Sequence, residues 1–308
     1  MTTPVVVLGG AGFIGRHVCR RLAAKGEIVY ALGHGEWPES EWRSWGVTRW
    51  QADDIALASI ATLIGDESPK ALIHCGGTGS VARAYANPYL DFERAVASTA
   101  VIAEFARHRA LGNCRVVLVS SAAVHGDQGD VDLSENSGHS PISPYGFHKA
   151  AAENICYMYS RFYGVTASIV RLFSVYGEGL RKQLLWDAMD KFTSGQNQFF
   201  GTGHELRDWV HVDDAAELLA RAALSSQASM EIYNGCNEQA TTREVLTMLA
   251  TLAGGTEPIF NGETHFGNPR RLTATGSHAR TQLKWAPTIS LREGLSRYAH
   301  WFLSTHGR

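Results

Sequence analysis

The first half of the chain alternates short apolar runs with longer amphipathic stretches. Uninterrupted runs rich in Val, Ile and Leu are typical of strands buried on both faces of a parallel sheet. Such runs, or extended segments like them, occupy residues 5–8, 27–32, 71–74, 115–120 and 166–172, and one more ends near Ala52. Apolar residues near helical spacing lie between them, up to about Lys25, after Pro88 and over residues 145–163. This alternation predicts an α/β fold, a doubly wound parallel sheet with helices on both faces.

The pattern changes past Tyr176. Glycine, asparagine and proline become frequent, and short extended segments mix with helical ones such as 242–253 and 291–303. No repeat, low-complexity tract or linker divides the chain. We therefore predict a larger domain over residues 1–172 and a smaller C-terminal lobe over residues 173–308, partly interleaved and with a cleft between them.

Composition and charge indicate a soluble protein without a general affinity for polyanions. The 308 residues are 44% apolar and carry 28 basic and 30 acidic side chains, for a formal charge of -2. We therefore expect no nucleic-acid partner and no membrane association. The five cysteines form no CxxC pair, which favours reduced thiols. No apolar run approaches the roughly 20 residues of a membrane span and the start lacks a signal peptide, so we expect a cytoplasmic protein.

The segment GGAGFIG, residues 9–15, lies between the first predicted strand and the first predicted helix. Glycine lets the chain turn tightly, bring its backbone close to a phosphate and set a helix near the sheet. The helix start adds free N–H groups and a partial positive charge, which suit a pyrophosphate. We expect a Rossmann-like, NAD(P)-binding domain whose cofactor contacts Gly9, Gly12, Phe13, Ile14 and Gly15.

Two further segments bear on the cofactor. Asp54 and Ile55 follow the third predicted strand, where the Asp54 carboxylate can accept a hydrogen bond from the adenine amino group or cap a helix. The second strand ends at Gly33-His34 without the acidic residue that binds the ribose 2′-hydroxyl of NAD. A 2′-phosphate would meet no repulsion there, and His34 or Arg16 can contact it. We therefore expect NADP(H) in preference to NAD(H), although His34 as a plain loop residue is the alternative.

Tyr145 and Lys149 lie four residues apart at the start of a predicted helix, so their side chains share a face. An ammonium beside a phenol stabilises the phenolate and lowers its pKa from about 10 toward neutrality. Such a phenol can exchange a proton with a hydroxyl or carbonyl oxygen while a hydride moves. Ser121, after the fifth predicted strand, supplies a hydroxyl that orients the same oxygen. These three residues are the candidate catalytic residues.

Joined to further motifs, these residues make the chain resemble the extended short-chain dehydrogenase/reductases, specifically the NAD-dependent epimerase/dehydratase family acting on nucleotide sugars. The resemblance runs nearly end to end and rests on GGAGFIG (9–15), DDI (53–55), VSSAAVHG (119–126), SPYGFHK (143–149), RLFSVYG (171–177) and RDWVHVDD (207–214). It implies a Rossmann domain, a nucleotide-sugar-binding lobe and a homodimer built from two helices of each subunit. It also makes Tyr145 the acid/base, Lys149 its partner and a ribose ligand, and Ser121 the anchor of the substrate oxygen.

The resemblance further assigns candidate substrate contacts. Arg207 matches an arginine that contacts the nucleotide diphosphate, a role suited to the bidentate guanidinium, with a surface ion pair as the alternative. Arg270 or Arg271 is a candidate second clamp. His125 and Ser174 stand where the family usually has tyrosine and asparagine, so both are expected to line the substrate pocket, with His125 as a pocket-wall histidine rather than a second proton donor.

The sequence says less about which reaction the protein catalyses than about which family it resembles. Related dehydratases carry Asp-Glu after the catalytic Ser or Thr, whereas Ala122 and Ala123 have no proton to exchange, so we do not expect dehydration. The missing ribose-binding carboxylate favours a nucleotide 4-keto(-6-deoxy)hexose reductase over a 4-epimerase that retains NAD, like UDP-glucose 4-epimerase. A non-catalytic, nucleotide-sensing member of the fold is a further alternative, which Tyr145 and Lys149 disfavour. No HExxH or Cys/His spacing suggests a metal, and no GxSxG elbow suggests a hydrolase.

Overall fold

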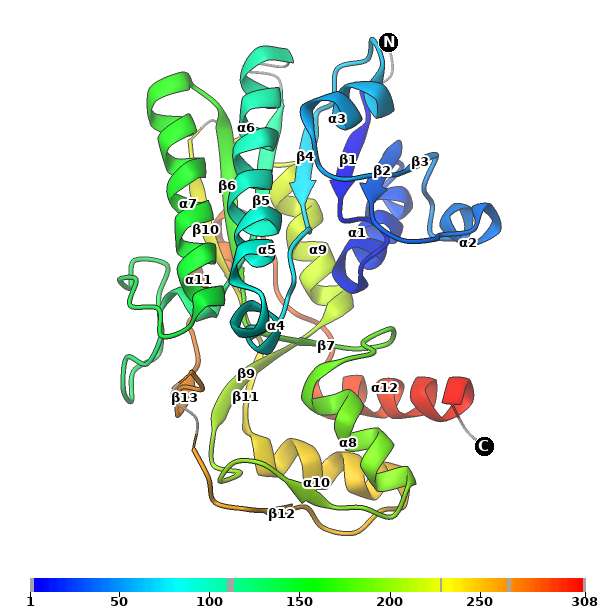
Figure 1. Cartoon of the computed structure of the whole chain (residues 1–308), viewed down its shortest axis with the longest axis vertical. Coiled ribbons are helices and arrows are strands. Elements are labelled where there is room, and N and C mark those ends of the chain that lie inside the picture. The colour runs from blue at the N-terminus through cyan, green and yellow to red at the C-terminus, as the bar shows by residue number, and fades with distance from the viewer. Residues whose placement is uncertain (1–2, 110–113, 228, 265–266, 307–308) are drawn as a thin grey trace.

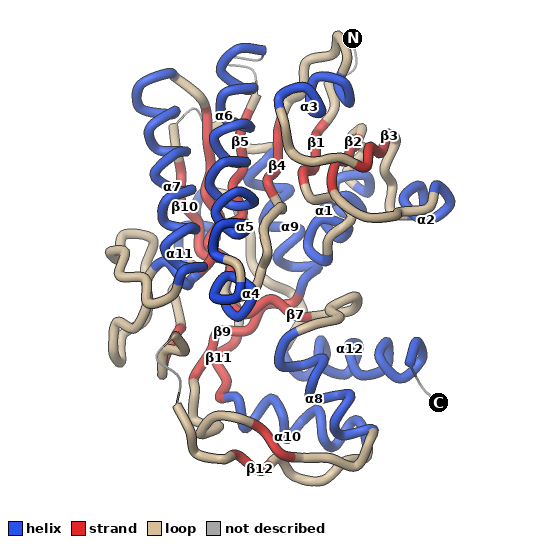
Figure 2. Tube along the Cα trace, viewed as in Figure 1, coloured by secondary structure: helices blue, strands red, loops and turns tan. Residues whose placement is uncertain are grey.

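The computed structural model describes residues 3–109, 114–227, 229–264 and 267–306. A seven-stranded parallel sheet has the order β10-β6-β5-β4-β1-β2-β3 (Figures 1 and 2). Its strands are β1 Val5–Leu8, β2 Val29–Gly33, β3 Arg49–Ala52, β4 Ala71–His74, β5 Arg115–Ser121, β6 Thr166–Leu172 and β10 Glu231–Gly235. The strand order reverses between β1 and β4, and ligands bind at such a switch point in doubly wound sheets. The predicted Rossmann-like fold is confirmed.

Helices cover both faces of this sheet, which explains the uninterrupted apolar runs. Val5 and Val7 of β1 belong to a core shared with α1 (Phe13–Ala24) and α9 (Val212–Ala223). Val6 and Leu8 point to the other face, in a core shared with α3 Leu57–Ile64, α6 Ser98–Arg109 and α7 Pro144–Tyr163. The short helices α2 Glu39–Ser44 and α11 Ser277–Gln282 complete this part of the molecule.

The segment after Pro88 forms three consecutive elements rather than one helix. These are α5 Pro88–Phe92, the π-helical turn η1 Glu93–Ala97 and α6, and α4 Val81–Ala86 precedes them. The Ser98 hydroxyl donates to Arg94 O and the Thr99 hydroxyl to Ala95 O, so side-chain hydrogen bonds accompany the widened turn.

The smaller part of the molecule lies below the parallel sheet in Figure 1. A short sheet joins β7 Ser174–Tyr176, β9 Leu206–His211, β11 Glu238–Thr241 and β13 Arg271–Leu272, while β8 Gln198–Phe199 pairs with β12 Ile259–Phe260. Three helices share its apolar core, namely α8 Gln183–Thr193, α10 Thr242–Ala253 and α12 Leu291–His306. The chain leaves this part after β9 to form α9 and β10 and then returns to it. The cleft between the two parts is therefore crossed repeatedly by the chain.

Two kinds of feature are absent from the described residues. None of the helices is long and apolar enough to cross a membrane. The same residues contain no cluster of three or more His, Cys, Asp or Glu side chains arranged to hold a metal ion.

Candidate active site

The glycine turn after β1 has the geometry of a phosphate cradle. Gly9 has φ of +86°, and a Cβ there would lie 2.7 Å from Gly76 N, so the backbones of two loops meet where a side chain has no room. Gly12 is the N-cap of α1; no side chain caps this helix start, and its first turn carries no acidic residue. The open N–H groups and the helix dipole suit the diphosphate of a dinucleotide.

A cavity of about 570 Å³ extends from this turn along the ends of β1, β2 and β4. Its walls include the predicted cofactor residues Gly9, Gly12, His34, Asp54 and Ile55. A larger cavity of about 860 Å³ adjoins it, and the two share wall residues Gly12, Cys75, Gly76 and Gly77. The predicted Phe13, Ile14 and Gly15 line the larger cavity, so the start of α1 faces the junction.

The end of β2 gives no support to the expected NADP preference. His34 Nε2 lies 2.9 Å from Asp54 Oδ1, so a carboxylate stands beside the proposed phosphate contact. Arg16 donates to Ala11 O, pairs with Glu41 and stacks on Trp37, and it lines neither cavity. Negative charge beside His34 opposes a 2′-phosphate, and the Arg16 guanidinium is engaged elsewhere.

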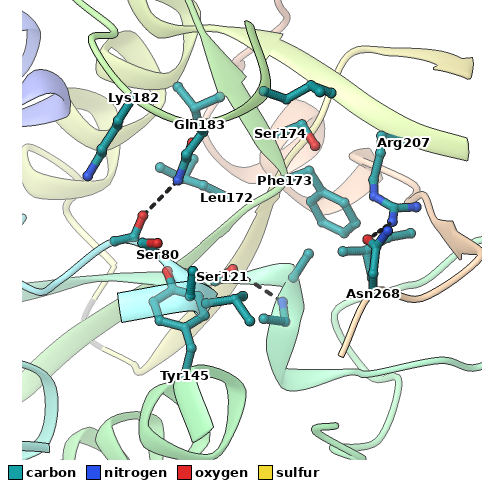
Figure 3. A pocket seen from close by; sticks show the side chains of 18 of the residues that line it. Ser80, Ser121, Tyr145, Leu172, Phe173, Ser174, Lys182, Gln183, Arg207 and Asn268 are labelled. Atoms are coloured by element: carbon teal, nitrogen blue, oxygen red, sulfur yellow. Dashed lines mark hydrogen bonds between the residues drawn. The ribbon is translucent and has the colours of Figure 1, made fainter. Parts of the chain in front are cut away.

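Ser121 and Tyr145 lie together on the wall of the larger cavity (Figure 3). Ser121 ends β5 and accepts a hydrogen bond from Ala123 N at 3.2 Å in the following turn η2 Ala122–Val124. Helix α7 begins beside that turn. The Ser143 hydroxyl accepts a hydrogen bond from Gly146 N and Pro144 occupies the first helical position, so the helix starts at this point of the chain. The strand end and the helix start therefore bring the two hydroxyl groups to one point.

Burial shifts the pKa values of Tyr145 and Lys149. Burial raises the pKa of Tyr145 to about 12; the hydrogen bond with Ser121 works against this shift and the Asp91 carboxylate adds to it. Lys149 Nζ donates to Val119 O at 2.9 Å and lies 5.8 Å from the centre of the Tyr145 ring. Burial also lowers the pKa of Lys149, although the Asp91 charge opposes that shift. Burial of the phenol and the Asp91 charge raise the Tyr145 pKa here, and the Lys149 ammonium donates to a carbonyl. The expected lowering of the phenol pKa by Lys149 stays a prediction.

A buried polar cluster behind this pair had no counterpart in the sequence analysis. Asp91 of α5 is fully buried. It accepts a hydrogen bond from Thr78 in the loop after β4, and its other oxygen lies 2.7 Å from His148 Nδ1 on α7. The loop after β4, helix α5 and helix α7 are apart in the sequence and come together only when the chain folds. Sequence spacing therefore gave no signal for the cluster.

Arg207 and Ser174 line the larger cavity. Their contact with a substrate stays a prediction. Arg207 on β9 donates to Asn268 Oδ1 at 2.5 Å and to Pro269 O at 2.6 Å, contacts that hold the guanidinium at the wall (Figure 3). Burial lowers the pKa of Arg207 to about 10, and the Glu205 and Asp127 charges oppose the shift, so the side chain is cationic at neutral pH.

Three predicted substrate residues do not reach this cavity. Arg270 pairs with Asp130 at 2.8 Å and Arg271 with Asp132 at 2.7 Å, so the structure gives no support to either arginine as a second clamp. His125 is fully buried rather than at the pocket wall, with Nδ1 3.1 Å from Gly138 O. Burial lowers its pKa to about 4, so it is neutral at pH 7 and cannot serve as a proton donor in the cavity.

Other wall residues were missed by the sequence analysis. They are Ser80, Phe173, Lys182 and Gln183. They come from the start of α4, the link between β6 and β7 and the start of α8. These segments meet only through the path of the chain between the two parts, so residue spacing gave no sign of them.

Comparison with known proteins places the chain in a family. The model of the NAD dependent epimerase/dehydratase family matches residues 5–235. UDP-glucose 4-epimerase of Mycolicibacterium smegmatis is 30% identical over 311 residues, covering 96% of this chain and 97% of that protein. The structure of Thermus thermophilus UDP-glucose 4-epimerase in complex with NAD has a TM-score of 0.87 at 26% identity, covering 97% and 99% of the two chains. That of dTDP-glucose 4,6-dehydratase from Streptomyces venezuelae with NAD bound has a TM-score of 0.89 at 26% identity, covering 99% and 98%. The chain belongs to the NAD-dependent epimerase/dehydratase family, as the motifs indicated.

Proposed function

We propose that the protein is a nucleotide-sugar 4-epimerase that retains NAD, with a UDP-hexose as the first substrate to test. One observation carries this proposal. Ser121 and Tyr145 lie together on the wall of the larger cavity, which also contains Arg207 and adjoins the smaller cavity beside the glycine turn. The epimerase was the second choice from the sequence. A UDP-glucose 4-epimerase at 30% identity and the engaged Arg16 and His34 now favour it over the reductase.

The residues that line the two cavities fit NAD. The glycine turn and the start of α1 would hold the diphosphate, Asp54 and Ile55 the adenosine side, and Lys149 the nicotinamide ribose. Bound there, NAD would supply a reversible acceptor for the hydride of sugar C4.

The chain's own groups move the proton and hold the sugar. Tyr145 takes the proton from the 4-hydroxyl oxygen and gives it back, and Ser121 orients that oxygen by a hydrogen bond. Arg207 grips the substrate diphosphate, which keeps the nucleotide in place while the sugar presents its other face. A cavity of about 860 Å³ leaves room for that reorientation.

Two other reactions of the family are less well supported. A dehydratase needs a protonatable group after Ser121, and we propose that Ala122 and Ala123 prevent dehydration. A 4-keto(-6-deoxy)hexose reductase would use Ser121, Tyr145 and Lys149 in the same way. The single observation in its favour is the β2 end at Gly33, which is followed by His34 and not by a carboxylate.

The test is product formation without added cofactor. Purified protein is incubated with UDP-glucose, and the nucleotide sugars are separated by chromatography. The proposal expects UDP-galactose to accumulate to a constant ratio. Absence of any 4-epimer, with stoichiometric consumption of NADPH by a 4-keto nucleotide sugar, would overturn it in favour of the reductase.

We also propose a homodimer and a cytoplasmic location. Large aromatic side chains are exposed on α5 and α7, namely Tyr89, Phe147, Tyr157 and Phe162. Such a face suits a second copy of the chain, and light scattering on the purified protein checks the mass. All five cysteines are free thiols, which suits a reducing compartment.

A further inference from the structure

Two side chains at the start of α8 reach across the larger cavity to the loop after β4. Gln183 Nε2 donates to Gly79 O at 2.8 Å. Lys182 Nζ lies 3.5 Å from Thr78 O, and a Cβ on Gly79 would come within 3.1 Å of it. In Figure 3, Lys182 and Gln183 lie at the upper left, above Tyr145, and Arg207 lies at the right. The smaller part of the molecule thus presents a cation to the dinucleotide-binding part.

The backbone at this point is strained. Gln183 has φ of +67°, a left-handed conformation that residues with a side chain rarely adopt. Strained backbone of this kind persists where surrounding contacts fix it, and it is frequent at ligand sites. Here the amide contact with Gly79 O fixes the segment that presents Lys182.

The charge of Lys182 is not neutralised within the described part of the chain. No carboxylate pairs with it there, and the Arg83 side chain nearby is a second cation without an ion pair. Burial and the Arg83 charge both lower the pKa of Lys182. Lys191 on the same cavity wall differs, because Asp187 lies 2.8 Å from its ammonium. A partly desolvated ammonium beside an exposed second cation is stabilised when an anion binds next to it.

We propose that Lys182, positioned by Gln183 over the Thr78–Gly79 loop, binds an anionic oxygen of a ligand in the larger cavity. The inference rests on the proposed function. Arg207 serves the substrate diphosphate at the other side, so Lys182 is free for a different anion. Two sources have this chemistry: a phosphate of the dinucleotide, whose groove shares Gly76 and Gly77 with this cavity, or a carboxylate on an acidic sugar.

The experiment compares Lys182→Met with Lys182→Arg, which keeps the cation, and with Lys191→Met, which removes an already paired cation from the same wall. One arm measures the release rate of NAD from each purified protein against excess labelled NAD. The other measures dissociation constants for UDP-glucuronate and UDP-glucose by calorimetry. Circular dichroism checks that each variant is folded.

A tenfold or greater increase in the NAD release rate or in a sugar dissociation constant, confined to Lys182→Met, supports the inference. The quantity that changes identifies the anion. Faster NAD release with unchanged sugar binding assigns the dinucleotide phosphate. Weaker UDP-glucuronate binding with unchanged UDP-glucose binding assigns a sugar carboxylate. The inference is overturned if wild type and Lys182→Met have the same NAD release rates and sugar dissociation constants, or if Lys191→Met weakens binding as much as Lys182→Met does. The proposed function then still stands. A wild type that binds neither NAD nor a nucleotide sugar overturns both.

Discussion

At the scale of single residues, the proposed chemistry depends on how one phenol exchanges its proton. Burial keeps the pKa of Tyr145 at about 12, so the hydroxyl is protonated at neutral pH and ready to donate to a ketone oxygen. Its action as a base requires positive charge nearby. Lys149, 5.8 Å from the ring centre, is the group placed to provide it.

Replacement of Tyr145 by phenylalanine removes this proton exchange. We expect Tyr145→Phe to lower kcat about 10³-fold while the dissociation constants for NAD and UDP-glucose stay within a few-fold. Tyr159→Phe is the matched control, because Tyr159 lies on the same helix but hydrogen-bonds to Glu104 outside the cavity. Steady-state kinetics and calorimetry give both quantities, and a Tyr145→Phe enzyme with near-normal kcat contradicts the role.

The buried Asp91 carboxylate is expected to act on Tyr145 through its charge. That charge raises the pKa of the phenol, so Asp91→Asn should lower that pKa. Because Tyr145 takes the proton from the 4-hydroxyl group, its pKa governs the rising, acidic limb of the kcat/KM profile, which should move to lower pH. His278→Gln is the control, since it disrupts another His–carboxylate pair, with Glu231, away from the cavity. A reduced rate with an unmoved profile would mean that Asp91 has a structural role alone.

The sequence revealed those residues whose roles depend on local spacing. Tyr145 and Lys149 share a helix face, and Ser121 ends a recognisable strand, so all three could be found in advance. Arg270 and Arg271 looked equally available, but their partners Asp130 and Asp132 stand 140 and 139 residues earlier in the chain. Contacts at such separations depend on the path of the chain between the two parts, which residue types alone do not reveal.

At the scale of secondary-structure elements, the turn between β1 and α1 depends on the absence of a side chain at Gly9. Gly9→Ala introduces a methyl group 2.7 Å from Gly76 N at positive φ. We expect a loss of more than about 1 kcal/mol of unfolding free energy and of most copurified NAD. Gly26→Ala has similar φ, +81°, but open space around it, so it should retain NAD. Thermal denaturation and cofactor content check both, and an NAD-loaded Gly9→Ala protein contradicts the cradle.

Helix α7 is attached to β6 by a buried ion pair. Glu153 is 3% exposed and binds Arg171 and His139. Burial alone would raise the pKa of Glu153, but these partners outweigh it and lower the pKa to about 2.

The lowered Glu153 pKa fixes the sign of a pH effect. The stabilisation is complete above the ordinary pKa of 4.5 and is lost as pH falls toward about 2. Glu153→Gln should cost about 3 kcal/mol at pH 7 and flatten the stability profile between these limits. Glu104→Gln, which changes a half-buried pairing with Arg107, should cost clearly less than Glu153→Gln. Urea denaturation at several pH values measures both, and a Glu153→Gln protein as stable as wild type would contradict this account.

At the scale of the whole molecule, side-chain ion pairs and the path of the chain both join the two parts. Asp213 accepts from Arg297 on α12, and its other oxygen lies 2.7 Å from His17 Nδ1 on α1. Arg297 also binds Glu178, just after β7. The parallel sheet itself takes its last strand, β10, from the second half of the chain. The alternation of apolar runs and helical stretches predicted six strands of the sheet but not β10, whose sequence EIYNG is less apolar. The contacts between the two parts leave no periodic signal in the sequence.

The central claim is that a hydride leaves sugar C4 and returns to the same carbon on the opposite face without leaving the protein. Its most direct test uses UDP-glucose carrying deuterium at C4, incubated with the purified protein without added cofactor, with mass spectrometry and NMR of the products. The account predicts UDP-galactose that retains deuterium at C4. Formation of no 4-epimer, or of an epimer whose C4 deuterium has been replaced by solvent hydrogen, would contradict it.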